Sequence, residues 1–437
     1  MAAIALFEDS HWQNFAPISL TRPTFDIKVG ARTYFEEYTQ APEFLFTREF
    51  LAQTTQERHA ASIVNPGSFD ADTVFVNGLL HPAAVYLDRL SNIGHTFAIT
   101  SGQRLLVGRL GKKGGEYLTR CAAHGKKINL KKLDVEKSTD LKMQDTRGLL
   151  SNPWDIINAI ENSLSMQISA SDASDSSNVI GSNSSNNNSS NSAPSNVKVL
   201  GVNRVVIGQG AIIEDGTVLD ATQGGIRIGP EARIAPSRIV GPTFIGAMTQ
   251  VKQFTIIESS YVGYNCRIAG EVEHSVISDH TNKAHAGFIG HSYVGEWVNI
   301  GAMTTTSDLK MTYGNIKMDD GFGKKADTGS NKIGSFIGDM SKTSIGTLIY
   351  SGRRIGMSSH LHGLVAEDVP SFTIYGSSIG SANVELEFDS AIETQRKVMS
   401  RRNQKMSSAY EEMMRHVFTI TAEQRKKNRI RKAKFSI

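Results

Sequence analysis

The C-terminal half of the chain repeats an aliphatic residue every six positions, and this repeat limits the possible folds more than any other feature. Ile245, Val251 and Ile257 form one such series. Other positions share the spacing: Ile207, Ile213, Leu219, Val262 and Ile268. A six-residue period matches neither an α-helix nor an isolated strand, but it matches a solenoid in which each hexad forms one short face and one corner. The sequence therefore predicts a hexapeptide-repeat parallel β-helix over residues 197–375.

Glycine follows the aliphatic residue at many of these positions. Six pairs share this pattern: Ile207-Gly208, Ile228-Gly229, Ile245-Gly246, Val262-Gly263, Ile289-Gly290 and Ile337-Gly338. Small residues relieve crowding at the corners of a solenoid, and each coil buries its aliphatic side chains only against its neighbours. An ordinary β-sandwich with scattered Ile and Gly would not produce these repeated offsets.

Residues 1–168 alternate between strand-like and helix-like segments. Apolar runs over 4–8, 73–80 and 104–110 predict buried strands, and residues 31–37 and 153–168 predict helices. Alternation of this kind indicates an α/β domain.

Two further segments complete the predicted organisation. Residues 169–196 are almost entirely Ser, Asn and Asp, which cannot bury enough apolar surface to offset the ordering entropy, so we expect a disordered linker. Residues 376–437 lose the repeat and become rich in Lys and Arg, which predicts a basic helical tail.

Composition excludes several classes of protein. The 437 residues carry a net charge of +4, too small to indicate a nucleic-acid partner. Two widely spaced cysteines exclude a disulfide framework. No apolar run is long enough for a membrane span, and the first residues do not form a signal peptide, so we expect a cytoplasmic protein.

The segment from 270 to 318 is unusually polar for a β-helix. It contains four of the twelve histidines: His274, His280, His285 and His291. A solvated face with hydrogen-bonded histidines would account for any one of them, whereas the density of the whole cluster favours a functional site. Because no cysteine or acidic pair completes a zinc set, a metal site is disfavoured.

A family resemblance appears within this segment. The run Asn282-Lys283-Ala284-His285, followed by Trp297-Val298-Asn299-Ile300-Gly301-Ala302, resembles the acetyltransferase half of the bacterial GlmU family. Those enzymes join an N-terminal uridylyltransferase domain to a left-handed β-helix and make UDP-N-acetylglucosamine from glucosamine-1-phosphate. The longer run from 282 to 314 looks closer still to a GlmU-like group of sugar nucleotidyltransferases. The resemblance implies a nucleotidyltransferase-like α/β domain followed by a left-handed β-helix.

The resemblance also implies roles for individual residues. His285 aligns with the catalytic base, a neutral imidazole that would take a proton from the sugar amine as it attacks the acetyl thioester. The positions implied to bind the amino sugar or the acyl-CoA are Asn282, Lys283, Asn299, Ala302 and Asp308. Phe288 stands where the family has a Tyr that touches the sugar, and Asp308 where it has an Asn near the amine.

The N-terminal domain resembles a degenerate nucleotidyltransferase. Arg22 and Lys28 match cations that contact the triphosphate in that signature, although the glycine-rich loop before the Arg is missing. Asn77 lies on the strand that ends in the metal-binding Asp of the family, a position occupied here by Leu79. The resemblance therefore implies nucleotide binding by Arg22, Lys28 and Asn77 with Mg²⁺ as the cofactor, and a scaffold domain without turnover is the alternative.

The resemblance implies a transferase of sugar-nucleotide biosynthesis. It would transfer a nucleotidyl group to a sugar-1-phosphate, an acetyl group from acetyl-CoA to an amino-sugar phosphate, or both. Its ligands would be a nucleoside triphosphate, a sugar-1-phosphate and acetyl-CoA as acyl donor. The flat faces of a three-sided prism, together with related acyltransferases, predict a homotrimer. The alternatives are a nucleotidyltransferase whose β-helix is a scaffold and a non-catalytic subunit that binds sugar nucleotides.

Overall fold

The computed structural model describes residues 2–84, 93–142, 148–170, 178–180, 196–321 and 323–436. The chain divides into two compact units. The N-terminal unit comprises Met1–Lys28, Arg32–Pro153 and Ser407–Val417, and the β-helix unit comprises Val29–Ala31, Trp154–Met406 and Phe418–Ile437.

The N-terminal unit is built on a seven-stranded sheet in the order β5-β4-β1-β6-β8-β7-β9. Its strands are β1 (Ile4–Phe7), β4 (Phe44–Phe46), β5 (Ile63–Val64), β6 (Val74–Asn77), β7 (Phe97–Ser101), β8 (Arg104–Arg109) and β9 (Lys137–Asp140). β4 and β6 both pair with β1 in parallel, while β8 is antiparallel to both β6 and β7. The three strands predicted from the apolar runs correspond to β1, β6 and β8.

Both faces of this sheet are buried, which explains why β1 is apolar at every position. Ala5 and Phe7 pack into one core, and Leu6 packs into the core on the other face. The helices of this unit include α1 (Ala52–Arg58) and α3 (Lys112–Ala123).

One helix predicted from the sequence is wrong. Residues 31–37 form a short strand, β3 (Arg32–Thr33), and a 3₁₀ helix, η4 (Phe35–Glu37). The Glu36 carboxylate accepts a hydrogen bond from the backbone N–H of Thr33 (2.6 Å) and pairs with Lys28 (2.7 Å). The backbone turns extended again at Tyr38, so the helix stops after one turn. The helix predicted over 153–168 corresponds to α4 (Trp154–Asn158) and α5 (Ile160–Ala170).

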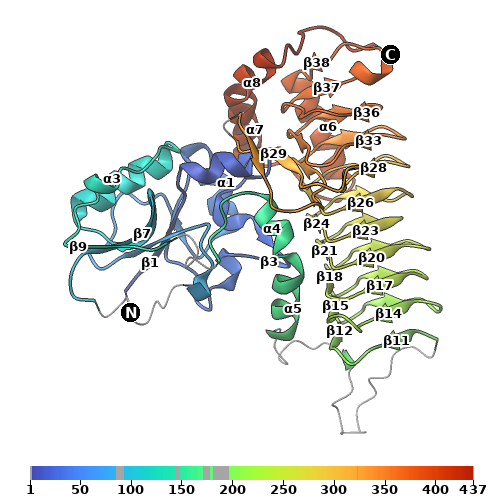
Figure 1. Ribbon diagram of the computed structural model, residues 1–437, viewed down its shortest axis with the longest axis horizontal. Helices are drawn as coiled ribbons and strands as arrows, with labels where there is room; N and C mark the ends of the chain where they lie inside the picture. The colour runs from blue at the N-terminus through green and yellow to red at the C-terminus, as the bar shows by residue number, and fades with distance from the viewer. Residues whose placement is uncertain are drawn as a thin grey trace. The chain divides into compact units, whose positions relative to one another are not determined.

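The β-helix unit stacks short parallel strands into three sheets, as predicted from the hexad repeat (Figure 1). The first sheet contains β12 (Val205–Ile207), β15 (Ile226–Ile228), β18 (Thr243–Ile245), β21 (Tyr261–Val262), β24 (Val276–Ile277), β27 (Tyr293–Val294), β31 (Phe336–Ile337) and β34 (Arg354–Ile355). The second contains β11 (Lys198–Leu200), β14 (Val218–Asp220), β17 (Arg238–Val240), β20 (Ile256–Glu258), β23 (Glu271–Glu273) and β26 (Phe288–Gly290). β28 (Thr305–Thr306), β33 (Leu348–Ile349) and β36 (Leu364–Val365) follow as a separate three-stranded sheet.

The third sheet contains β13 (Ile212–Ile213), β16 (Arg233–Ile234), β19 (Gln250–Val251), β22 (Arg267–Ile268) and β25 (Asn282–Lys283). β32 (Lys342–Thr343), β35 (His360–Leu361) and β37 (Thr373–Tyr375) form the corresponding strands of later coils. Ile228 pairs with Ile245, so the aliphatic residue of one coil lies on that of the next. These side chains form one continuous core from Val197 to Tyr375, which confirms the predicted parallel β-helix.

An insertion interrupts the coils after β28. The chain leaves at Asp308, forms the hairpin β29 (Lys317–Asp319) and β30 (Lys325–Asp327), and returns where the N–H of Ile333 donates to the carbonyl of Asp308 (2.9 Å). The insertion therefore leaves from one corner of the prism and returns to it.

Helices follow the last coil, as predicted for the tail: α6 (Phe388–Ser400), α7 (Ser408–Ile420) and α8 (Ala422–Lys427). In the β-helix unit, Phe418 packs edge-on against Phe372 at a centroid distance of 5.0 Å, and buried Arg425 pairs with Glu385 (2.6 Å). These contacts cover the end of a solenoid that would otherwise expose its core.

The segment predicted as a linker, 169–196, lies largely outside the described residues. Its first two residues belong to α5, and Asn178–Ile180 form strand β10, which pairs antiparallel with β12.

Candidate functional site

His285 stands at an exposed corner of the β-helix, between β25 and β26. No side-chain hydrogen bond or ring contact of His285 occurs within the part of the chain that the structure describes. The corner continues into the next coil, where the N–H of Met303 donates to the carbonyl of Ala286 (2.8 Å). Ala302 therefore lies one coil from His285 at the same corner.

Lys283 fixes the backbone at this corner from inside the prism. Its side chain is buried, and its ammonium group donates to the carbonyls of Ala269 (2.6 Å), His285 (3.1 Å) and Gly287 (3.0 Å). Burial lowers the pKa of Lys283 to about 8, against a smaller opposite effect of Glu271. Because an ammonium group has three protons, these bonds use all of them, and Lys283 acts on the corner through the backbone.

Asn282 and Asn299 form a polar ladder on the third sheet. They occupy successive coils in register, and the Asn282 amide donates to the Asn299 side-chain oxygen (2.7 Å). The structure thus brings together two residues that the family resemblance assigned to ligand binding, 17 positions apart in sequence.

Asp308 lies at a different corner from His285. Its carboxylate is 2.7 Å from Nδ1 of His291, which follows β26, whereas His285 precedes it. Burial alone would raise the pKa of Asp308, but the hydrogen bond and charge of His291 hold it below its usual value. β26 therefore lies between the corner of His285 and the corner of His291 and Asp308.

The histidine cluster seen in the sequence resolves into separate contacts. His274 stacks on His291 with ring centroids 4.6 Å apart, and His280 stacks on Trp297 at 4.0 Å. His274 also pairs with Glu161 of α5 (2.8 Å), a contact the sequence analysis missed because 113 residues separate the two. The 17-residue spacing of His274 and His291 is one coil, so coil register could have predicted their stack.

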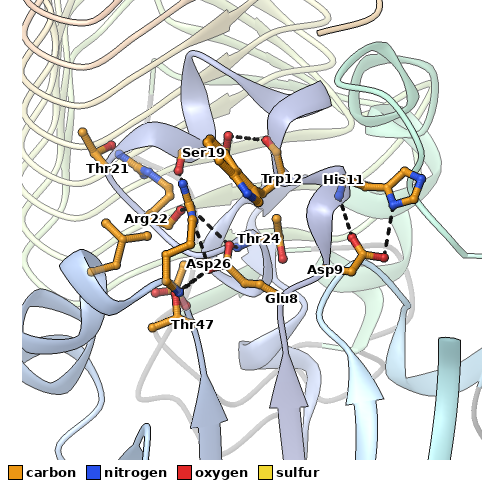
Figure 2. A network of polar contacts seen from close by, with 12 residues as sticks. Glu8, Asp9, His11, Trp12, Ser19, Thr21, Arg22, Thr24, Asp26 and Thr47 are labelled. Atoms are coloured by element: carbon orange, nitrogen blue, oxygen red, sulfur yellow. Dashed lines mark hydrogen bonds and ion pairs between the residues drawn. The ribbon is translucent and has the colours of Figure 1, made fainter. Parts of the chain in front are cut away.

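In the N-terminal unit, a buried ion pair lies directly after β1. Figure 2 shows Glu8 at the centre of a network with Thr24 and Thr47. Its carboxylate accepts from the N–H of Thr24 (2.9 Å), the hydroxyl of Thr47 (2.5 Å) and the guanidinium of Arg48 (3.1 Å). Glu8 and Arg48 are both almost fully buried, so each neutralises the other.

The three predicted nucleotide-binding residues are buried or paired with other residues of this unit. Asn77 is fully buried and donates to Asp9 (2.8 Å) and to the carbonyl of Leu105 (3.0 Å). Arg22 is buried, and Lys28 pairs with Glu36 at 2.7 Å. Leu79, at the position of the family's metal-binding Asp, is also part of the core.

A polar pocket of about 370 Å³ opens beside Asp9. Its lining includes Asp9, His11, Ser101, Arg104, Lys127 and Asn152, and it does not include the three predicted nucleotide-binding residues. Arg104 donates through Nε to the Asp9 carboxylate (3.0 Å). Although burial raises the pKa of Asp9, the charge of Arg104 and the hydrogen bond from His11 hold it well below its usual range.

Among the described residues, no group of three or more His, Cys, Asp or Glu side chains is arranged to hold a metal ion. None of the described helices has the length and apolar character needed to cross a membrane.

Comparison with protein families gives one match. Residues 4–171 match the family model described as sugar nucleotidyl transferase. The matched segment includes the whole seven-stranded sheet of the N-terminal unit.

Curated relatives are bifunctional enzymes. A bifunctional sugar-1-phosphate nucleotidylyltransferase/acetyltransferase of Sulfurisphaera tokodaii is 28% identical over 171 residues, covering 38% of this chain and 37% of the relative. The bifunctional protein GlmU of a Picosynechococcus strain is 31% identical over 145 residues, covering 30% of this chain and 28% of the relative. The chain thus matches about a third of the length of these relatives.

A solved structure from Bacillus cereus, provisionally titled an acetyltransferase, covers 52% of this chain and 99% of its own at 13% identity, with a TM-score of 0.23. That score is too low to support an argument. The family match and the curated relatives confirm the likeness to GlmU that the sequence motifs predicted.

Proposed function

We propose that this GlmU-like chain is a transferase of sugar-nucleotide biosynthesis, whose β-helix transfers an acetyl group from acetyl-CoA to an amino-sugar phosphate. The bifunctional relatives support the reaction type. The observation that carries the proposal is the state of His285: the residue at the position of the family's base is exposed at a corner and not used in packing.

His285 would act as the general base. Its neutral imidazole takes a proton from the sugar amine as the nitrogen attacks the thioester carbonyl. The new C–N bond replaces the C–S bond, and the departing thiolate takes up a proton to leave as coenzyme A. Lys283 would be a positioning residue, because its ammonium holds the carbonyl of His285 itself.

The remaining predicted residues divide between two roles. Asn282, Asn299 and Ala302 offer polar side-chain and backbone groups along the coils next to His285 and would contact the acyl donor or the sugar. Asp308, which pairs with His291, would contribute to the site from the other corner.

A homotrimer would complete the site. Along the corner of His285, the side chains of Met303 and Ile345 are 60% and 79% exposed, and Phe254 on an earlier coil is 86% exposed. Apolar residues exposed this far beside a candidate catalytic residue favour an interface with a second copy. Sedimentation of the intact chain should give a trimer, and Ile345→Glu should shift it toward monomer.

The N-terminal unit would bind the phosphorylated substrates. Its family match supports a sugar-1-phosphate and a nucleoside triphosphate as ligands. Its residues do not fit Mg²⁺, because the carboxylates after β1 already accept hydrogen bonds from Arg48 and Arg104, so we derive no step through the metal.

The test is an acetyl-transfer assay on the purified chain with acetyl-CoA and glucosamine-1-phosphate. The free thiol of the released coenzyme A measures the rate. His285→Ala should lower the rate by about 10²–10⁴-fold with little change in melting temperature, since the side chain is exposed. His291→Ala is the control, because its ring stacks and pairs within the fold and should affect stability more than rate. Equal rate losses in the two variants would overturn the assignment of the base.

A further inference from the structure

The pocket beside Asp9 lies where the sheet of the N-terminal unit reverses its strand order. β4 lies on one side of β1 and β6 on the other, and all three run parallel. In open α/β sheets, ligands bind outside the carboxyl ends of the strands at such a switch point. Asp9 follows β1, and Asn77 is the last residue of β6, so their hydrogen bond spans this point.

Both carboxylate oxygens of Asp9 already accept hydrogen bonds. Oδ1 of Asp9 accepts from the N–H of His11 (2.9 Å), and Oδ2 accepts from Asn77 and Arg104. A divalent cation at Oδ2 of Asp9 would compete with Arg104, and displacing Arg104 would leave a buried guanidinium without its counter-ion. The carboxylate after β1 is therefore held by an arginine, and the position of the family's metal-binding Asp is taken by buried Leu79.

Buried donors at the pocket have no partner. Nη2 of Arg104 and the hydroxyl of Ser101 are buried without a hydrogen bond in the part of the chain that is described. An unsatisfied buried donor is costly, and one that borders a pocket is a position that a ligand oxygen would satisfy. Exposed Lys127 adds a second cation to the lining.

The lining indicates the chemistry of the ligand. Asp9 is neutralised by Arg104, so Lys127 leaves the pocket with an excess of positive charge. No Phe, Tyr or Trp of the described residues lines it, so a nucleobase would find no aromatic ring to stack on. Its volume is near the lower end of the range for ligand pockets, roughly 300–1,000 Å³. These features fit a small, hydroxylated anion better than a nucleoside triphosphate.

We propose that the N-terminal unit binds a monosaccharide phosphate at this pocket without a divalent cation. The guanidinium of Arg104 donates hydrogen bonds to the sugar or phosphate oxygens, and Lys127 pairs with the phosphate. The hydroxyl of Ser101 and the amide of Asn152 hydrogen-bond to the remaining sugar oxygens. The inference rests on the proposed sugar-phosphate role of this unit, and it is independent of acetyl transfer by the β-helix.

Calorimetric titration of the intact chain tests the proposal. The probes are glucose-1-phosphate, galactose-1-phosphate and N-acetylglucosamine-1-phosphate, none of which has an amine that could accept an acetyl group. At least one should bind with the same Kd, within twofold, in EDTA and in excess Mg²⁺. Lys127→Ala should weaken binding roughly tenfold through the loss of a charge-assisted hydrogen bond, and Ser101→Ala should also weaken it.

Lys126→Ala is the matched control, since Lys126 is the exposed neighbour of Lys127 and does not line the pocket. It should bind as the parent chain does. Binding that requires Mg²⁺, that is unchanged in Lys127→Ala, or that is absent for all three probes would overturn the inference. An absence of acetyl transfer in the separate assay would overturn the function proposed for the β-helix and leave this pocket unaffected.

Discussion

In the N-terminal unit the residues that match a family signature are buried or paired within the fold, whereas in the β-helix the matching histidine is exposed and has no side-chain partner among the described residues. Asn77 is fully buried and hydrogen-bonded to Asp9, and Lys28 pairs with Glu36. His285, in contrast, is exposed at a corner whose backbone is held from below by Lys283. The same resemblance thus leads to two different physical situations.

The difference shows that a matched residue type is not yet a functional group. A side chain whose donors and acceptors are already used by the fold must give up those bonds before it can bind a ligand. In the N-terminal unit, Glu8 and Asp9 are each neutralised by an arginine, so the charges stabilise the protein. In the β-helix, the ammonium group of Lys283 fixes the backbone of the corner by donating to the carbonyl of His285. The imidazole of His285 is therefore not needed to hold the corner in place.

The largest expected effect concerns the buried pair of Glu8 and Arg48. Glu8→Gln should destabilise the N-terminal unit by about 3–5 kcal/mol, because it leaves a buried guanidinium without its counter-ion. Urea unfolding followed by circular dichroism measures this change. Glu36→Gln, which removes a more exposed pair with Lys28, should cost at most ~1 kcal/mol. Similar losses in the two variants would show that Glu8 is not the structural group we take it to be.

A smaller effect is expected at Lys283. Lys283→Met keeps the length of the side chain but leaves the carbonyls of Ala269 and His285 without the ammonium, which should cost about 1–3 kcal/mol. Because the backbone of His285 loses an anchor, kcat for acetyl transfer should fall while KM changes little. Lys252→Met, at an exposed position, is the control for both measurements. An unchanged kcat in Lys283→Met would separate Lys283 from the function of the corner.

The smallest effect concerns the dependence of β-helix stability on pH. Burial, with the charge of Lys342, lowers the pKa of His360 to about 4, whereas the pKa of an unfolded histidine is about 6.5. Between these values the unfolded chain binds more protons, so stability should fall as the pH drops from about 6.5 to about 4, and this contribution should level off below that. His360 is partly exposed, so we expect about 1–2 kcal/mol. His360→Gln should flatten this part of the profile, and parallel profiles for the two chains would contradict the account.

The sequence predicted the β-helix well because its core obeys a local rule. Each buried aliphatic, such as Ile228 and Ile245, recurs at a fixed spacing and pairs with its equivalent in the next coil. The fold could therefore be predicted without a structure. The position of His285 at an exposed corner was found only in the structure.

The contacts that decide whether a matching side chain can bind a ligand could not be predicted in this way. Arg104 is 95 residues from Asp9, and Glu161 is 113 residues from His274. Pairings over such distances depend on how strands and helices pack, which the spacing of residues does not specify. Lys283 illustrates the point, since its identity suggests a ligand contact while its burial directs all its protons to carbonyls.

The most direct test measures both half-reactions in one preparation of the intact chain. Thiol release from acetyl-CoA with glucosamine-1-phosphate reports on the β-helix, and pyrophosphate release from UTP with a sugar-1-phosphate and Mg²⁺ reports on the N-terminal unit. We predict acetyl transfer that depends on His285, with no Mg²⁺-dependent release of pyrophosphate. Release of pyrophosphate that requires Mg²⁺ would contradict the account of the N-terminal unit, and an absence of acetyl transfer would contradict the account of the β-helix.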